Sequence, residues 1–239
     1  MKKAAVAELT MRTGKKFLRA AKTEVLRHPV MTHPFWARFE RGEMSPQGLK
    51  RFAIHYYHHV LRTRLYDAMV LARATDEALQ AALAQILWDE YGQGNPDRTH
   101  PAQFRRFLKA LGLREADWTD VTLLPEFEAY TDIHTRLCSD ADVWVGAGVV
   151  GLAMEYPIPP LYARLVRGFR KLLVPESGLE FFLEHIPTDE VHASVVEHAL
   201  LPYLNAEPIQ TAIQLGMRRS MDARKLFMDG LERVTFGEK

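Results

Sequence analysis

The chain has 239 residues, with 31 Lys and Arg against 30 Asp and Glu, and a formal net charge of +1. This balance excludes the basic excess typical of nucleic-acid-binding proteins and excludes an acidic tail. A hydrophobic content of 47% is sufficient for a sizeable core. The single cysteine, Cys138, excludes an internal disulfide framework and a thiolate metal site, and it favours a reducing compartment.

Membrane association is not expected either. The longest apolar run, residues 143–154, is shorter than the roughly 20 residues needed to span a bilayer. The basic N-terminus lacks the continuous apolar stretch of a signal peptide. We therefore expect a cytoplasmic protein that binds neither membrane nor nucleic acid.

Apolar residues recur at three- and four-residue spacings along nearly the whole chain, and no stretch alternates as a strand does. The pattern predicts helices at 4–27, 33–42, 46–74, 76–92, 99–112, 125–138, 141–155, 158–173, 178–202 and 206–234. Ser45 and Pro46 are typical of a helix start, and Gly112 is typical of a helix end. No internal repeat or domain boundary is visible, so residues 1–239 are expected to form one all-α domain, with residues 1–30 as an N-terminal helical extension.

A polar stripe follows one face of the predicted helix at 46–74. It consists of His55, His59, Arg62 and Tyr66, which recur at i, i+4, i+7 and i+11. The stripe is either a solvated face or the wall of a substrate pocket. If it lines a pocket, Arg62 is suited to hold a substrate carboxylate. The spacing of His55 and His59 permits metal binding, but no carboxylate joins them on the stripe.

The next chemical segment joins two helices through a glycine-rich turn. Glu90 ends one helix and His100 starts the next. A turn between antiparallel helices could bring the two side chains together. Alternatively, Glu90 is a surface carboxylate at a helix end, and His100 caps the N-terminus of the following helix.

Glu155 ends an apolar run that holds no other charge after Asp142. Gly146, Gly148 and Gly151 within this run indicate close helix packing. An ionised carboxylate in such surroundings is costly unless it is paired or bound to a metal. The alternative is that the helix simply reaches the surface at Glu155, before the following prolines.

The segment His185-x3-Asp189-x2-His192 places two imidazoles and a carboxylate within roughly 60° of one another on a helix. The same pattern can arise by chance on a polar helix. The flanking residues are largely apolar, however, and burying these three groups without a partner would be unfavourable. Pro187 interrupts this helix and predicts a kink next to His185.

Together these segments supply three carboxylates and three imidazoles: Glu90, His100, Glu155, His185, Asp189 and His192. Two metal ions with three ligands each would keep positions open for O2 and a substrate. Mixed histidine and carboxylate ligands with open positions favour iron, with manganese as the lesser option. The chain has no Glu-x-x-His motif, so the ferritin-like arrangement of two such motifs is disfavoured.

These motifs resemble the haem-oxygenase-like di-iron oxidases and oxygenases, which are related to the TenA and PqqC folds. The resemblance covers residues 33–235, and its first matching segment begins at His33. It implies a seven-helix bundle, here with an extra N-terminal helix, that is commonly a homodimer. It also implies that the same six residues bind two irons, which use O2 as co-substrate in N-oxygenation, oxidative decarboxylation or C–C cleavage.

The branch of this family that the chain resembles most is the CADD-like proteins, which make p-aminobenzoate from one of their own tyrosines. The chain departs from that branch at three positions, where Trp36 and Met154 replace tyrosines and Leu165 replaces a lysine. It also has Arg64 near the position of an extra carboxylate found in some N-oxygenases, so a seventh ligand is not expected.

The sequence therefore predicts an O2-dependent di-iron enzyme acting on a small organic metabolite that carries an amino or carboxylate group. Two alternatives remain at this point. One is a metal-free enzyme of the PqqC or TenA type, and the other is a binding protein without catalytic activity, in which the six residues would be dispersed.

Overall fold

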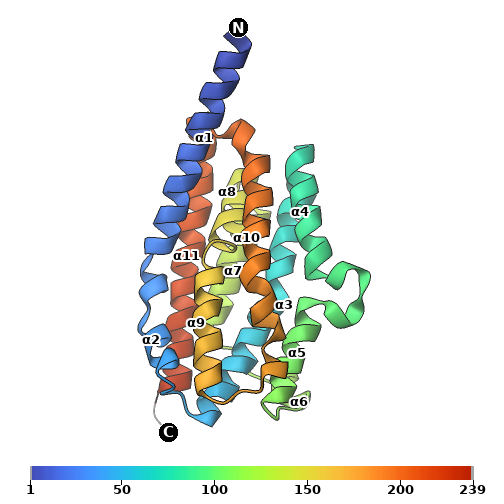
Figure 1. The fold of residues 1–239 in the computed structure, drawn as a ribbon, viewed down its shortest axis with the longest axis vertical. Coiled ribbons are helices and arrows are strands. Elements are labelled where there is room, and N and C mark those ends of the chain that lie inside the picture. The colour runs from blue at the N-terminus through green and yellow to red at the C-terminus, as the bar shows by residue number, and fades with distance from the viewer. Residues whose placement is uncertain (1, 238–239) are drawn as a thin grey trace.

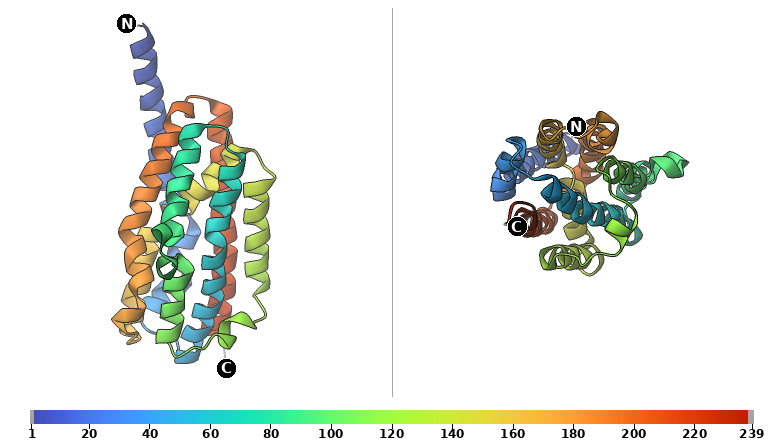
Figure 2. Two further views of the ribbon diagram at one scale, coloured as in Figure 1. Left: turned by 90° about the vertical axis from the view of Figure 1, so that its right-hand side faces the viewer. Right: turned by 90° about the horizontal axis from the view of Figure 1, so that it is seen from below.

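The computed structural model describes residues 2–237, and the side chains of residues 11–237. Its long helices run roughly parallel to one axis of the molecule (Figures 1 and 2). The α-helices are α1 Lys2–Arg27, α2 Pro34–Glu40, α3 Pro46–Arg73, α4 Glu77–Glu90, α5 His100–Ala110, α6 Ala116–Thr119, α7 Pro125–Ser139, α8 Val143–Gly148, α9 Ile158–Lys171, α10 Glu180–Leu200 and α11 Glu207–Phe236. Residues 2–237 contain no strand. None of the helices in this range is both long enough and apolar enough to cross a bilayer.

Local signals place several helix ends where the sequence predicts them. The Ser45 hydroxyl accepts a hydrogen bond of 3.0 Å from the backbone N–H of Gly48, and Pro46 is the first residue of α3. Gly112 follows α5 with φ +73°, a conformation that favours glycine. The short helix α6 was not predicted, because four residues are too few for a periodic pattern.

The helix predicted over 141–155 is present over residues 143–153, but it is not an α-helix throughout. Helix α8 ends at Gly148, and residues Val149–Ala153 form a π-helical turn. The backbone N–H of Met154 donates to the carbonyl of Val149, five residues earlier, at 3.0 Å. Nearly every residue of this segment is apolar, so its periodicity could not reveal the extra residue in the turn. Such turns are frequent at functional sites, and this one directly precedes Glu155.

The close packing expected around the glycines of this segment is present. A methyl group on Gly148 would collide with the backbone carbonyl of Ile213 in α11. In the reverse direction, a methyl group on Gly216 in α11 would collide with the carbonyl of Val145. The backbones of α8 and α11 therefore touch directly, which holds the π-turn and the start of the following loop in the interior.

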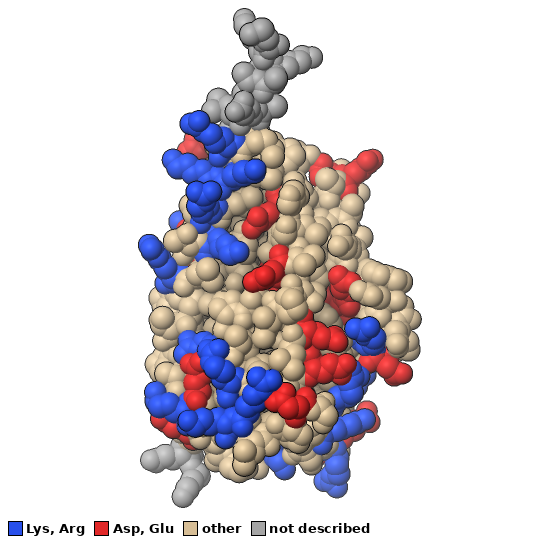
Figure 3. All heavy atoms as spheres, viewed as in Figure 1, with Lys and Arg blue, Asp and Glu red and all other residues tan. Residues whose placement is uncertain are grey.

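Helix α1 lies along the outside of the bundle, beside α11 (Figure 1). Its buried residues, Phe17, Leu18, Ala21 and Val25, join the main core. Helix α3 is more central and packs against α4, α5, α7 and α11. The face shown in Figure 3 carries both signs of charge, with Lys and Arg gathered on the side of α1 and α2.

Candidate metal centre

The turn between α4 and α5 brings Glu90 and His100 together. Gly92, Gln93 and Gly94 all have positive φ, which reverses the chain within a few residues. The His100 Nδ1 and Glu90 Oε2 atoms lie 2.8 Å apart, and both side chains are buried. Glu90 Oε2 is buried without a hydrogen-bond partner, so lone pairs of the carboxylate remain unused.

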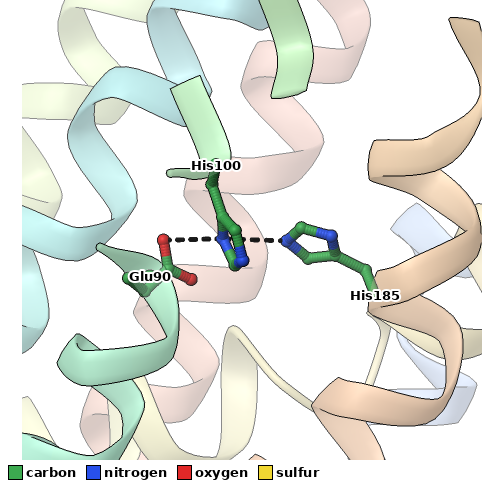
Figure 4. Close-up of side chains that lie close together, drawn as sticks. All are labelled: Glu90, His100 and His185. Carbon is green, nitrogen blue, oxygen red and sulfur yellow. Dashed lines mark hydrogen bonds and ion pairs between the residues drawn. The ribbon is translucent and has the colours of Figure 1, made fainter. Parts of the chain in front are cut away.

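His185 on α10 completes a first group of three. Its Nε2 lies 3.1 Å from His100 Nδ1, and its Nδ1 donates a 2.6 Å hydrogen bond to the carbonyl of Phe181. Figure 4 shows the three side chains pointing toward one another from α4, α5 and α10. One ligand atom from each residue lies within 4.8 Å of the other two.

The second group consists of Glu155, Asp189 and His192, whose ligand atoms also lie within 4.8 Å of one another. His192 Nδ1 is 3.6 Å from Glu155 Oε2 and 4.0 Å from Asp189 Oδ1. The opposite nitrogen, Nε2, donates to Asp89 Oδ2 at 3.2 Å. Asp89 thus orients the ring so that Nδ1 faces the two carboxylates.

The two groups differ in the direction of their pKa shifts, which are downward in the first group and upward in the second. Burial alone would raise the pKa of Glu90, but the contact with His100 outweighs burial and lowers this pKa to about 2. Burial, and then the neighbouring His100, lowers the pKa of His185 to about 3. At neutral pH the first group therefore offers an ionised carboxylate and a neutral His185, whose Nδ1 carries the proton given to Phe181 and whose Nε2 lone pair faces His100 Nδ1.

In the second group the pKa shifts favour the binding of protons. Burial raises the pKa of Glu155, and burial followed by the charge of Glu155 raises the pKa of Asp189 well above its usual range. Burial disfavours the His192 cation, but Glu155 and Asp189 outweigh it and raise the pKa of His192 to about 10. A cation placed among these residues would take over the role of the protons, as metal binding to such ligands generally does.

A cavity of about 40 Å³ lies between the two groups. It is lined by five of the six predicted ligand residues, together with His59, Thr63, Asp67, Tyr162 and Arg224 among others. An outer pocket of about 260 Å³ shares His100 and His185 with this cavity and is lined by Asp89, Arg98 and Glu184. The outer pocket therefore lies directly beside the first group.

The polar stripe predicted on α3 divides between different surroundings. Only His59 lines the cavity. His55 is buried elsewhere, and Tyr66 packs against the His134 ring with 5.2 Å between centroids. Arg62 is exposed and lines a separate surface pocket with Leu123 and Glu128. The residues of α3 that line the cavity are instead His59, Val60, Thr63 and Asp67.

Two charged residues of the cavity wall, Asp67 and Arg224, were not predicted from the sequence. Asp67 is 5% exposed, and its Oδ1 has no hydrogen-bond partner. Burial, followed by the charges of Glu155 and Glu90, raises the pKa of Asp67 well above its usual range. Arg64, which was aligned with the extra carboxylate of some relatives, instead lies over the ring of Tyr91. Asp67 follows Thr63 by four residues and so lies on the same face of the helix. This spacing was the signal in the sequence that could have indicated Asp67.

These donors fit a pair of metal ions. Two oxygens in this cavity, Glu90 Oε2 and Asp67 Oδ1, are buried without partners. The separations of 2.8 and 3.1 Å in the first group match neighbouring ligand atoms around one ion with bonds of about 2.0–2.2 Å. Mixed imidazole and carboxylate donors suit iron.

Comparison with known proteins agrees with this class of site. The model of a family of iron-containing redox enzymes matches residues 50–225, and the chain belongs to this family. A relative named 4-aminobenzoate synthase, from Nitrosomonas europaea, is 25% identical over 214 residues, which cover 84% of this chain and 85% of the relative.

Solved structures confirm the fold. A CADD-like protein of unknown function from Nostoc punctiforme has a TM-score of 0.78 at 13% identity, covering 93% of this chain and 98% of that one. A domain with a haem-oxygenase-like fold from Shewanella denitrificans has a TM-score of 0.70 at 15% identity, covering 94% of both chains. The predicted all-α, haem-oxygenase-like fold is therefore confirmed.

Proposed function

We propose that the protein is a non-haem di-iron oxidase or oxygenase that uses O2 to oxidise a small organic metabolite. One observation carries the proposal: two buried groups, each with three ligand atoms within 4.8 Å, lie against a single cavity. The membership in a family of iron-containing redox enzymes supports iron over manganese. The reaction classes proposed are N-oxygenation, oxidative decarboxylation and C–C cleavage.

Iron in this site would supply the activation of O2, and the residues of the chain define the surroundings of that chemistry. The hydrogen bonds from His185 to Phe181 and from His192 to Asp89 fix which nitrogen of each ring faces the centre. Burial, followed by the charges of Glu155 and Glu90, raises the pKa of the Asp67 carboxyl group, which favours its protonated form. Met154, Ile158 and Phe181 supply apolar walls that limit the access of water.

Relatives of the chain are named 4-aminobenzoate synthase, so the synthesis of 4-aminobenzoate is a second candidate function. Trp36, Met154 and Leu165 stand where the corresponding branch has two tyrosines and a lysine, and all three are buried. We therefore propose a separate small-molecule substrate rather than one of the protein's own tyrosines. Intact-mass measurement after exposure of the iron-loaded protein to air tests this point, because a sacrificed tyrosine would change the mass of the chain.

Anaerobic titration with Fe(II) tests the main proposal. The expected result is two ions per chain, one for each group, with a transient visible absorption after exposure to air. His185→Ala and Glu155→Ala should each bind about one ion fewer, because each removes a ligand from a different group. His198→Ala, on the exposed face of the same helix α10, is the matched control and should bind as the wild type does.

Failure of the wild-type protein to bind iron, or equal binding by the two ligand variants and His198→Ala, would refute the di-iron centre. Activity that survives complete removal of iron would instead support the metal-free type of enzyme. We also propose a homodimer in the cytoplasm, for which sedimentation velocity is the direct measurement of the assembly.

A further inference from the structure

Arg224 on α11 is a charged side chain that the di-iron proposal does not use. It is only 5% exposed, and its guanidinium lines the cavity beside the two groups. One of its nitrogens donates a long hydrogen bond of 3.4 Å to the carbonyl of Ala153. Its Nε is buried and has no partner. The guanidinium carries five N–H donors, and within residues 11–237 it forms one hydrogen bond to a protein acceptor.

Other arginines of the protein form close ion pairs with glutamate side chains. Arg106 makes two contacts of 2.9 and 2.6 Å with Glu180, and Arg167 binds Glu40 at 2.7 Å. Both are more exposed to solvent than Arg224. Within the part of the chain that the structure describes, Arg224 forms no comparable ion pair. A buried guanidinium without a carboxylate within ion-pair distance is unfavourable, so this position favours an anionic ligand.

Two further polar groups share this side of the cavity. His59 is 3% exposed, and its Nδ1 has no hydrogen-bond partner. Tyr56 donates its hydroxyl proton to the Tyr162 hydroxyl at 3.2 Å, which leaves the Tyr162 proton free for an acceptor in the cavity. The cavity wall therefore offers a cation and two hydrogen-bonding groups in addition to the predicted ligands.

We infer that Arg224 binds the carboxylate of the substrate and so holds the rest of that molecule against the two metal-binding groups. The inference rests on the proposed di-iron function and adds the chemical class of the substrate. A planar carboxylate matches the guanidinium fork with two parallel hydrogen bonds. The role that sequence analysis gave to the exposed Arg62 thus belongs to Arg224.

The charged groups and the volume of the cavity restrict the class of ligand further. Four carboxyl groups, those of Asp67, Glu90, Glu155 and Asp189, also line the cavity, and they would repel a dianion such as phosphate more strongly than a monocarboxylate. The cavity volume of about 40 Å³ favours a small ligand over a bulky one. The substrate is therefore a compact monocarboxylate.

Calorimetric titration of the metal-free and the anaerobic Fe(II)-loaded protein tests the inference. The probes are acetate and propionate, their neutral equivalents acetamide and propionamide, and inorganic phosphate. We expect the wild type to bind each acid at least about tenfold more tightly than the matching amide and than phosphate. Arg224→Met should abolish the preference for the acid, and Arg224→Lys should weaken acid binding by about tenfold, because lysine lacks the planar fork.

Arg62→Met is the matched control and should bind the acids as the wild type does, since Arg62 lines a different pocket. Circular dichroism and iron counting show whether each variant is folded. If Arg224→Met does not fold, the comparison of acid with amide in the wild type and the result for Arg224→Lys decide. Equal binding of acid and amide, tighter binding of phosphate, or an acid preference that survives in Arg224→Met would overturn the inference.

The iron count separates this inference from the di-iron proposal. Arg224 is not one of the predicted ligands, so Arg224→Met should still bind two ions per chain. A wild type that binds no iron but distinguishes acid from amide through Arg224 would defeat the di-iron proposal alone. A wild type that binds iron but shows no such distinction would defeat the carboxylate site alone.

Discussion

Asp89 and His192 are linked by a hydrogen bond of 3.2 Å between the imidazole Nε2 and the carboxylate Oδ2, although 103 positions separate them in the sequence. Glu90, the next residue after Asp89, belongs to the first ligand group, whereas His192 belongs to the second. The last turn of α4 therefore contributes to both groups. A shift of this turn would disturb the two groups together, which couples their geometry.

Replacing Asp89 with Asn should weaken iron binding at the second group. The amide keeps the shape of the side chain but removes the charge that orients the His192 ring and increases its basicity as a ligand. Losses of about 10–100-fold in metal affinity are typical of such changes. In anaerobic competition with a chelator, Asp89→Asn should lose one ion at lower chelator concentration than the wild type does.

Asp132→Asn is the control, because Asp132 is an exposed carboxylate on α7 away from both groups. Simultaneous loss of both ions from Asp89→Asn would indicate that α4 as a whole has moved. Retention of both at wild-type affinity would show that Asp89 has no influence on the centre.

Asp67 faces the same cavity but does not belong to either group of three ligand atoms. Asp67→Asn should therefore still bind about two Fe(II) per chain in the anaerobic titration, since each group keeps its three donors. A drop to one ion would identify Asp67 as a seventh ligand. The spectrum after exposure to air provides an independent measurement, because loss of a ligand changes the iron absorption bands.

The sequence was sufficient to find residues whose chemistry is unusual for their surroundings. Spacing on one helix predicted that His185, Asp189 and His192 lie together, and the apolar context of Glu155 indicated that it is buried. The structure brings these residues together with Glu90 and His100 in two adjacent groups. Their metal-binding role remains a prediction.

The residues that line the cavity could not be predicted from the sequence in the same way. On α3, His55, His59, Arg62 and Tyr66 look equivalent, because amphipathic periodicity identifies a polar face but not the neighbouring helix that covers it. The packing of α7 against α3 decides that Tyr66 is enclosed with His134. Arg224 was not predicted for a related reason, because an arginine on a long helix is ordinarily on the surface.

The glycines of the α8 region provide a test of packing. A methyl group on Gly151 would collide with the side chain of Val196 in α10. Gly151→Ala should lower the free energy of unfolding by about 1–3 kcal/mol, as overpacked cores generally do. Combined with Val196→Ala, the loss should be smaller than the sum of the single variants by at least about 0.5 kcal/mol, because the second change removes the colliding atoms.

Gly148→Ala offers no such rescue, since its methyl group would meet the backbone carbonyl of Ile213. It should be at least as destabilising as Gly151→Ala, and Ile213→Ala should not relieve it. Urea unfolding of the single and double variants measures each of these differences. Additive losses for Gly151→Ala and Val196→Ala would show that the π-helical turn and α10 move apart instead.

The buried His134 predicts loss of stability in acid. Its Nδ1 bonds to the carbonyl of Tyr130 and its Nε2 to the hydroxyl of Ser220, both at 2.8 Å. Burial lowers the pKa of His134 from 6.5 to about 3, so the ring stays neutral in the folded protein while the unfolded chain takes up a proton below about pH 6.5. Stability from this residue is thus fully present above pH 6.5 and is lost as the pH falls toward 3.

Urea unfolding between pH 7 and pH 4 measures this effect. One proton taken up only by the unfolded chain reduces the free energy of unfolding by about 1.4 kcal/mol for each pH unit below the unfolded pKa. In His134→Gln the dependence on pH should be shallower by about that amount, whatever the overall stability of the variant, because glutamine does not titrate. Parallel curves for the two proteins would mean that His134 is protonated equally in the folded and unfolded states, and hence that its burial between α7 and α11 does not exclude the charge.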